Sequence, residues 1–156
     1  MHVEEMKMKR LLPTFMLVLL LVSMLTFSSN LQSVKASGTI YIRADGSIDP
    51  PTAPISSVDN IIYTFTDNIY DEIVVERDNI VVDGAGYTVQ GTGGGNGIDL
   101  TVRSNVTIKN TQIKKFFYGI WLYSSSNNIV GNNITNNELG IWLEYSSGNS
   151  IYHTNS

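Results

Sequence analysis

The chain has 156 residues, of which 42% are hydrophobic and 15% charged, and its formal net charge at pH 7 is −4. This composition is typical of a single ordered domain and excludes a disordered chain. The sequence contains no cysteine, which excludes disulfide bonds and thiolate metal sites, so packing and hydrogen bonds must supply its stability.

The segment 1–36 has the three parts of an export signal. Basic residues at 7–10 precede an almost unbroken apolar run at 11–27, and the exit Val34-Lys35-Ala36 fits cleavage by signal peptidase. We expect a signal peptide at 1–36 and therefore an exported protein, located in the periplasm, at the cell surface or outside the cell. An uncleaved membrane anchor is the alternative, because about 17 apolar residues lie near the lower limit for spanning a bilayer.

Removal of this signal makes the remaining chain more acidic. It leaves 12 acidic and 6 basic residues, a net charge of −6. A chain with this balance would be repelled by phosphate backbones, which argues against nucleic acid as a partner.

Residues 37–70 are expected to form an N-terminal cap. Strands are indicated at 39–43 and 61–66, and the proline-containing stretch at 49–54 between them follows no repeat. A lid of this kind over the first coil of a stack would cover strand edges that otherwise promote aggregation.

Residues 71–156 contain an internal repeat. The tetrad Gly-Ile-Trp-Leu at 119–122 returns at 140–143, and a related tetrad stands at 97–100. Ile108 and Ile113 recur at the same spacing as Ile129 and Ile134. A period of roughly 20–25 residues is typical of leucine-rich repeats and of parallel β-helices.

Composition favours the β-helix. Each copy holds short alternating strands rich in Ile, Val, Thr and Tyr, and no stretch has the 3.6-residue period of a helix. The sequence therefore predicts an all-β parallel β-helix, a solenoid whose coils stack Ile and Val in inward ladders. The corner asparagines are expected to adopt left-handed turns and to hydrogen-bond the adjacent coil, and one extra residue in the last copy is placed near Glu144.

The last copy, from Asn149, stops within a coil, so we expect the chain to be truncated at its C-terminus. About four coils are near the minimum of three that repeat stacks need. An uncapped last coil predicts edge-to-edge self-association.

The segment Asp78-Asn79-Ile80-Val81-Val82-Asp83-Gly84-Ala85-Gly86-Tyr87, followed by Gly-Ile-Trp-Leu and Ser-Ser-x-Asn-x-Ile coils, resembles the NosD-like parallel β-helix proteins, also grouped as carbohydrate-binding and sugar-hydrolase domains. The opening at 38–47 resembles that of exported archaeal members. The resemblance covers essentially all of the chain after the signal. It implies a right-handed parallel β-helix, and it implies this fold more strongly than a reaction, because relatives include lyases, epimerases and a copper-maturation accessory protein.

Five outward residues are candidates for binding a sugar. In each tetrad the Ile and Leu point inward, so Asp99, Trp121 and Trp142 point outward at equivalent positions. Tyr123 and Tyr145, which stand one repeat apart, are expected to align in the same way. Exposed flat rings suit the apolar faces of a polysaccharide or cell-envelope glycan. An aromatic ladder that only stabilises the stack is the alternative.

No catalytic residue is predicted. The available acids and bases match no known pattern of the pectin-degrading relatives, and solvated surface charge accounts for them. They are Asp83, Asp99, Glu138, Glu144, Arg103, Lys109, Lys114 and Lys115. Calcium is the cofactor to consider in such a fold, and no clear site supports it.

No metal site is predicted either, because His153 is the one histidine after the signal and all five methionines precede residue 25.

Asn105 and Asn133 match the N-glycosylation pattern.

Three functions remain open from the sequence. The first is a non-catalytic surface or periplasmic β-helix that binds polysaccharide or has a structural role. The second is a fragment of a polysaccharide lyase or hydrolase whose catalytic coils are missing. The third is a NosD-type accessory protein for copper maturation.

Overall fold

The computed structural model describes residue 16 and residues 38–156. The expected signal peptide at 1–36 lies outside the described residues apart from Met16, and its cleavage stays a prediction. Residues 38–156 form strands and turns and contain no helix. Among the described residues, no helix has the length and apolar character needed to cross a membrane.

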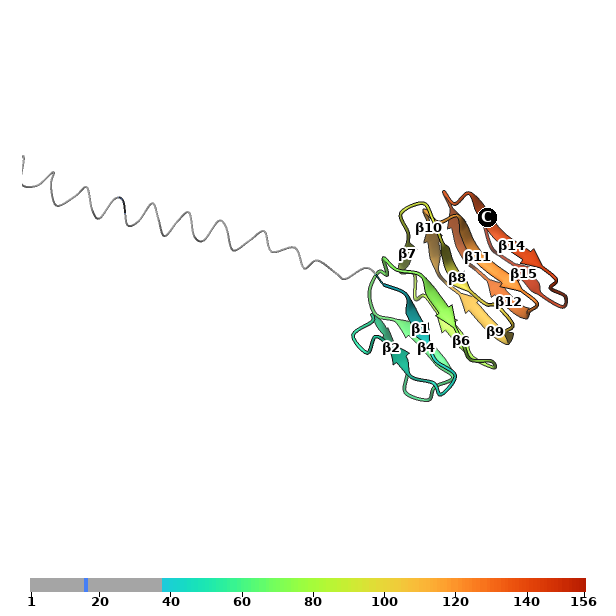
Figure 1. The fold of residues 1–156 in the computed structure, drawn as a ribbon, viewed down its shortest axis with the longest axis horizontal. Helices are drawn as coiled ribbons and strands as arrows, with labels where there is room; N and C mark the ends of the chain where they lie inside the picture. Colours follow the sequence, from blue (N-terminus) through green and yellow to red (C-terminus); the bar gives the residue numbers. More distant parts are fainter. Residues whose placement is uncertain (1–15, 17–37) are drawn as a thin grey trace, which may run out of the picture. The chain divides into compact units, whose positions relative to one another are not determined.

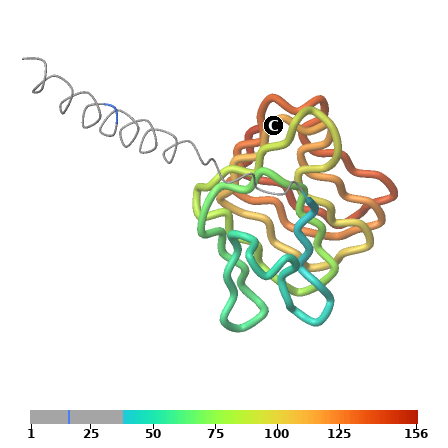
Figure 2. The backbone as a smooth tube through the Cα atoms, turned by 60° about the vertical axis from the view of Figure 1, so that its left-hand side comes forward, coloured from blue at the N-terminus to red at the C-terminus, as the bar shows by residue number. Residues whose placement is uncertain are grey.

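The strands form three sheets, and the chain visits them in turn (Figure 1). The first sheet contains, in spatial order, β14 (Leu139–Glu144), β11 (Tyr118–Tyr123), β8 (Asn96–Asp99), β5 (Ile73–Val75), β1 (Ile40–Ile42) and β2 (Ile48–Asp49). The second contains β15 (Ser150–Tyr152), β12 (Ser126–Val130), β9 (Ser104–Lys109), β6 (Val81–Asp83), β4 (Ile62–Phe65) and β3 (Ile55–Ser56). The third contains β13 (Asn133–Thr135), β10 (Gln112–Lys114) and β7 (Thr88–Gln90). The result is the predicted right-handed parallel β-helix, with about four turns that follow one another in Figure 2.

The register of the parallel strands confirms the repeat. Trp121 pairs with Trp142 on one side and with Asp99 on the other. Ile113 pairs with Ile134, its equivalent in the next coil. Because side chains in a strand alternate between its two faces, this register places the Ile and Leu of every tetrad on the inner face of its strand.

The interior is a single core of stacked aliphatic side chains. Ile73, Ile98 and Ile120 follow one another through the first sheet and are fully buried. Each such side chain contributes roughly 1.5–3 kcal/mol on burial. A coil cannot bury this edge alone, so stability depends on neighbouring coils.

Three asparagines fasten the corners of successive coils. Each amide oxygen accepts the backbone N–H of the residue 21 positions earlier, at 2.9–3.0 Å. Each amide nitrogen donates to the carbonyl 24 positions earlier, at 2.9–3.1 Å. These residues are Asn127, Asn132 and Asn137. The predicted bonding between coils is therefore present. None of these three asparagines has a left-handed φ, whereas Asn79, Asn105, Asn110 and Asn136 at other turns have one, of 52–59°.

Glycines line a second corner, where the third sheet passes into the first. A Cβ at Gly119 would lie 2.4 Å from the Gly140 carbonyl oxygen, and a Cβ at Gly97 would lie 2.5 Å from that of Gly119. The coils approach so closely there that no larger residue fits without displacing the backbone.

At the N-terminal end, short strands cover the edges of two sheets. β2 pairs antiparallel with β1, and β3 pairs antiparallel with β4. The buried Tyr63 hydroxyl donates to the Gly46 carbonyl at 2.9 Å and ties these loops together. This arrangement shields the parallel edges from further strand pairing.

Candidate ligand-binding face

The outer face of the first sheet carries a ladder of equivalent positions. Tyr41, Val74, Asp99, Trp121 and Trp142 follow one another in register across five strands. The three outward residues predicted at the tetrads therefore lie side by side. Trp142, on the last strand, has 39% of its surface exposed, and Trp121 is half-buried.

Six side chains form what we call the aromatic strip: Phe117, Tyr118, Trp121, Tyr123, Trp142 and Tyr145. Tyr118 lies between the two tryptophans, with its ring centroid 4.6 Å from that of Trp121 and 6.0 Å from that of Trp142. The rings of Trp121 and Tyr123 are parallel, with centroids 6.4 Å apart. Phe117 meets Tyr118 edge-on at 4.7 Å. The strip thus follows β11 along its whole length.

Tyr145 joins the strip in a different way from the one predicted. The register pairs Tyr123 with Glu144, so the expected alignment of Tyr123 with Tyr145 is wrong. Tyr145 instead corresponds to Ser124, and both have a left-handed φ, of 49° and 50°. Its ring still meets Tyr123 edge-on, with centroids 5.6 Å apart. Hydrogen bonds from Ser125 to Ser146 and from Asn127 to Asn149 show that the extra residue lies at 147–148 rather than near Glu144.

Tyr118 and Phe117 were not predicted from the sequence. Tyr118 stands one residue before the tetrad, where the alternation of inward and outward side chains is broken at the buried Gly119. The run Phe116-Phe117-Tyr118 next to the repeat was the available signal. Three consecutive aromatic residues indicate a large area for contact with a ligand, but the run does not indicate which of the rings face outward.

Asp99 lies on the ladder, but its carboxylate is used locally. Oδ1 accepts hydrogen bonds from the backbone N–H and the hydroxyl of Thr101, at 2.8 and 2.6 Å. Oδ2 accepts one from the Asn96 amide at 3.0 Å. These bonds hold the carboxylate against the turn after β8. Asp99 therefore contributes to the shape of the face, and its carboxylate is not directed toward a ligand.

The remaining acids and bases are dispersed over the coils. Asp83 pairs with Lys109 at 3.0 Å, and Arg103 with Asp78 at 3.4 Å. Burial alone would raise the pKa of Asp83, but hydrogen bonds from Ala85, Asn110 and Lys109 lower it below its ordinary value. In the part of the chain that the structure describes, no three His, Cys, Asp or Glu side chains gather as metal ligands would.

Both glycosylation motifs lie at the surface. Asn105 is exposed with a left-handed φ of 54° and donates to the Asn79 amide oxygen at 3.0 Å. Asn133 is exposed in β13. Modification at either position stays a prediction.

The match to known families covers nearly all of the described chain. Residues 29–155 match the family model described as "Periplasmic copper-binding protein (NosD)". No curated protein and no solved structure matches the chain.

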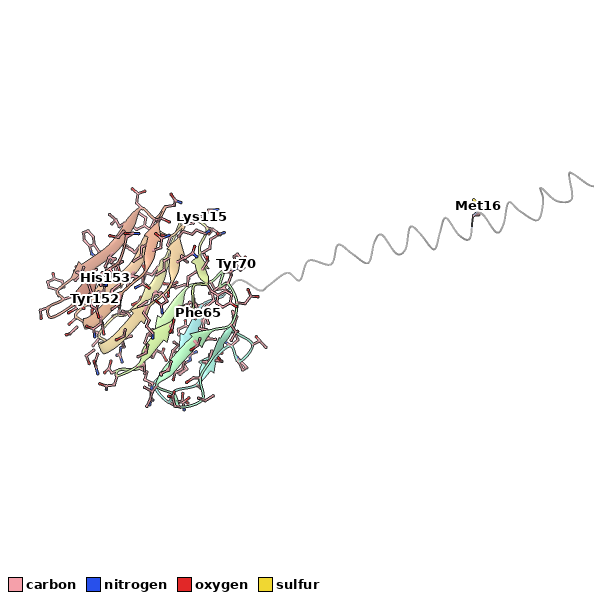
Figure 3. All side chains as sticks on the ribbon, turned by 180° about the vertical axis from the view of Figure 1, so that it is seen from behind. Met16, Phe65, Tyr70, Lys115, Tyr152 and His153 are labelled. Atoms are coloured by element: carbon pink, nitrogen blue, oxygen red, sulfur yellow. The ribbon has the colours of Figure 1, made fainter. Side chains whose placement is uncertain are left out.

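Copper fits the described residues poorly. Protein copper sites use imidazole nitrogen and cysteine or methionine sulfur as their main ligands. Residues 38–156 contain one histidine, His153, and neither cysteine nor methionine. His153 is exposed at the C-terminal end of the stack, where its ring contacts Tyr152 (Figure 3). One imidazole does not complete a copper centre.

Proposed function

The chain belongs to the NosD family, and from this premise we propose that it is a non-catalytic β-helix that binds carbohydrate outside the cytoplasm through its aromatic strip. The description of the family as periplasmic fits an exported chain. A location at the cell surface or beyond belongs to the proposal.

The continuity of the strip is the observation that carries this proposal. Five ring contacts link the six side chains into one surface along β11 and onto the end of β14. A stack needs no aromatic residue for stability at these positions, since Val74 and Asp99 occupy them in earlier coils. Aromatic faces bury the C–H faces of sugar rings, and the indole N–H and phenol O–H offer hydrogen bonds at the ring edges.

Binding to a panel of immobilised cell-envelope and plant polysaccharides tests the proposal. We expect Trp142→Ala and Trp121→Ala each to weaken binding of the retained glycan by about tenfold, the loss of one ring-stacking contact of roughly 1–1.5 kcal/mol. Tyr87→Ala is the matched control, because Tyr87 is also exposed but precedes β7 in the third sheet. Equal binding by all three variants, or no retained glycan, would contradict the proposal.

The description of the family as copper-binding supports one second candidate, the role in copper maturation that the resemblance implies. Stoichiometric copper retained after dialysis by the exported chain and lost in His153→Ala would support that role. If the unsubstituted chain and His153→Ala both retain less than one copper ion per chain, glycan binding is the better account of the function.

A further inference from the structure

A polar hollow opens at the end of the aromatic strip, where the chain leaves the first sheet for the second. Its volume is about 430 Å³, within the range of roughly 300–1,000 Å³ that small-molecule sites occupy. Five serines from three successive coils line it: Ser104, Ser124, Ser125, Ser126 and Ser147. We call it the serine hollow.

Tyr145 connects the serine hollow to the strip. Its side chain forms a wall of the hollow and also meets Tyr123 of the strip. With 81% of its surface exposed, Tyr145 is the most accessible ring of the strip. A ligand stacked along β11 would therefore reach the serine hollow without leaving the surface.

Arg103 supplies a fixed donor in the hollow. Its Nη1 donates to the Glu76 carbonyl at 3.0 Å and its Nε to the Thr101 carbonyl at 3.2 Å, so the guanidinium is held in one orientation. Asp78, at 3.4 Å from Arg103, places a carboxylate in the same hollow. Hydroxyls, a guanidinium and a carboxylate together offer both donors and acceptors, which matches the hydroxyl groups of an uncharged sugar.

Charge argues against an acidic sugar here. The Arg103 guanidinium is already paired with the Asp78 carboxylate, so this pair offers no net positive charge to a uronate or sulfate, and the chain after the expected signal carries a net charge of −6. A neutral unit satisfies the polar groups without this cost.

We propose that the serine hollow is a terminal subsite for one neutral sugar unit of an oligosaccharide whose other units stack on the aromatic strip. The glycan then runs parallel to β11, across the axis of the β-helix. From Tyr118 to Tyr123 the strip spans about 16 Å at the usual rise of a strand, which is longer than a disaccharide needs. This inference rests on the proposed function, since it assigns the length and charge class of the same ligand.

Calorimetry with neutral cello- and malto-oligosaccharides, from disaccharide to hexasaccharide, tests the subsite. We expect affinity to rise with length in one series until the hollow is filled. The double variant S104A/S147A, which removes two exposed hydroxyls, should weaken binding of the long oligosaccharides by about tenfold and leave the disaccharide unchanged. Ser147→Tyr, which fills the hollow, should do the same. Ser150→Ala, exposed on β15, is the control.

The outcomes separate the two proposals. If Trp121→Ala abolishes binding while S104A/S147A binds every length normally, the strip binds glycan and the subsite is wrong. If neither neutral series binds, the subsite for a neutral sugar is wrong, and the proposed strip fails with it only when the polysaccharide panel also retains nothing. Tighter binding of oligogalacturonates than of both neutral series would overturn the assignment to a neutral sugar. Equal urea midpoints of the variants and the unsubstituted protein show that a loss of binding is not unfolding.

Discussion

The side chain of Asn132 provides hydrogen-bond partners for the backbone of the preceding coil at Thr111. Asn132 Oδ1 accepts the Thr111 N–H at 3.0 Å, and its Nδ2 donates to the Ile108 carbonyl at 2.9 Å. Asn132 and Thr111 are both buried, so water cannot substitute for these bonds. The corner between the second and third sheets is thus closed by a side chain where no strand pairing exists.

We expect Asn132→Ala to lower the free energy of unfolding by about 2–4 kcal/mol, because it leaves the buried Thr111 N–H unpaired and removes a hydrogen bond to the Ile108 carbonyl. Asn133→Ala is the matched control, since Asn133 is adjacent but exposed, and it should change stability by at most about 0.5 kcal/mol. Urea titrations followed by circular dichroism measure both. Equal midpoints for the two variants would show that the corner bond contributes little.

Substitution by alanine should have opposite effects on stability at two glycines, Gly119 in the glycine corner and Gly94 outside it. At Gly119 a methyl group would lie 2.4 Å from the Gly140 carbonyl oxygen and 2.6 Å from Ile134 Cγ2. Gly119→Ala should therefore force the coils apart and cost about 3 kcal/mol. At Gly94 nothing lies within 4 Å of a Cβ and φ is not left-handed, so Gly94→Ala should be neutral or stabilising by about 0.4–1 kcal/mol.

Thermal unfolding separates these two variants. A melting temperature for Gly119→Ala at or above that of Gly94→Ala would mean that the coils can shift at little cost.

The stability of the folded chain should depend on pH through Glu72. Burial raises the pKa of its carboxyl, and Asp99 adds a smaller effect, against a hydrogen bond from the Asn96 N–H at 3.3 Å. The folded state holds this proton more tightly than the unfolded state does. The stabilisation that Glu72 gives the fold is therefore fully present below the pKa of the unfolded chain, about 4.3, and is lost as pH rises through the higher pKa of the folded state.

Glu72→Gln keeps an oxygen for the Asn96 N–H but carries no charge. We expect it to raise the urea midpoint at neutral pH and to leave it unchanged at about pH 4, where the native carboxyl is protonated. The two curves of midpoint against pH should converge on acidification. A variant that is less stable than the native chain at neutral pH would contradict this account.

The fold was predictable because its signal repeats. The same positions point inward in every tetrad. Spacing alone was therefore enough to align the inward Ile98 and Ile120 and the outward Trp121 and Trp142. The family resemblance to NosD-like proteins is confirmed by the match over 29–155. Spacing works here because a coil of fixed length returns each residue to one face.

The site was less predictable because it lies at corners. Tyr118 and Tyr145 flank the regular strand, where one extra residue changes which side chains meet. The true position of that residue is marked by Ser146 and Asn149, whose hydrogen bonds to the previous coil become visible only in three dimensions. The serine hollow depends on three coils at once, and no local pattern indicates it.

Among the described residues, the coil that contains β14 and β15 presents its core residues to solvent. Leu143 is 42% exposed and Ile151 is 43% exposed, whereas their equivalents one coil earlier, Leu122 and Ile129, are fully buried. The backbone of β14 and β15 is also the outermost in its sheet. An apolar strand edge of this kind pairs readily with another chain.

We expect the chain of 156 residues to associate with a second copy through this edge. Light scattering should show a mass that rises with protein concentration. Ile151→Lys should shift the population toward monomer, because a charge on an edge strand opposes pairing. Tyr87→Lys adds the same charge to the third-sheet region and should leave the association unchanged. A monodisperse monomer at every concentration would mean that the exposed Leu143 and Ile151 are tolerated without a partner.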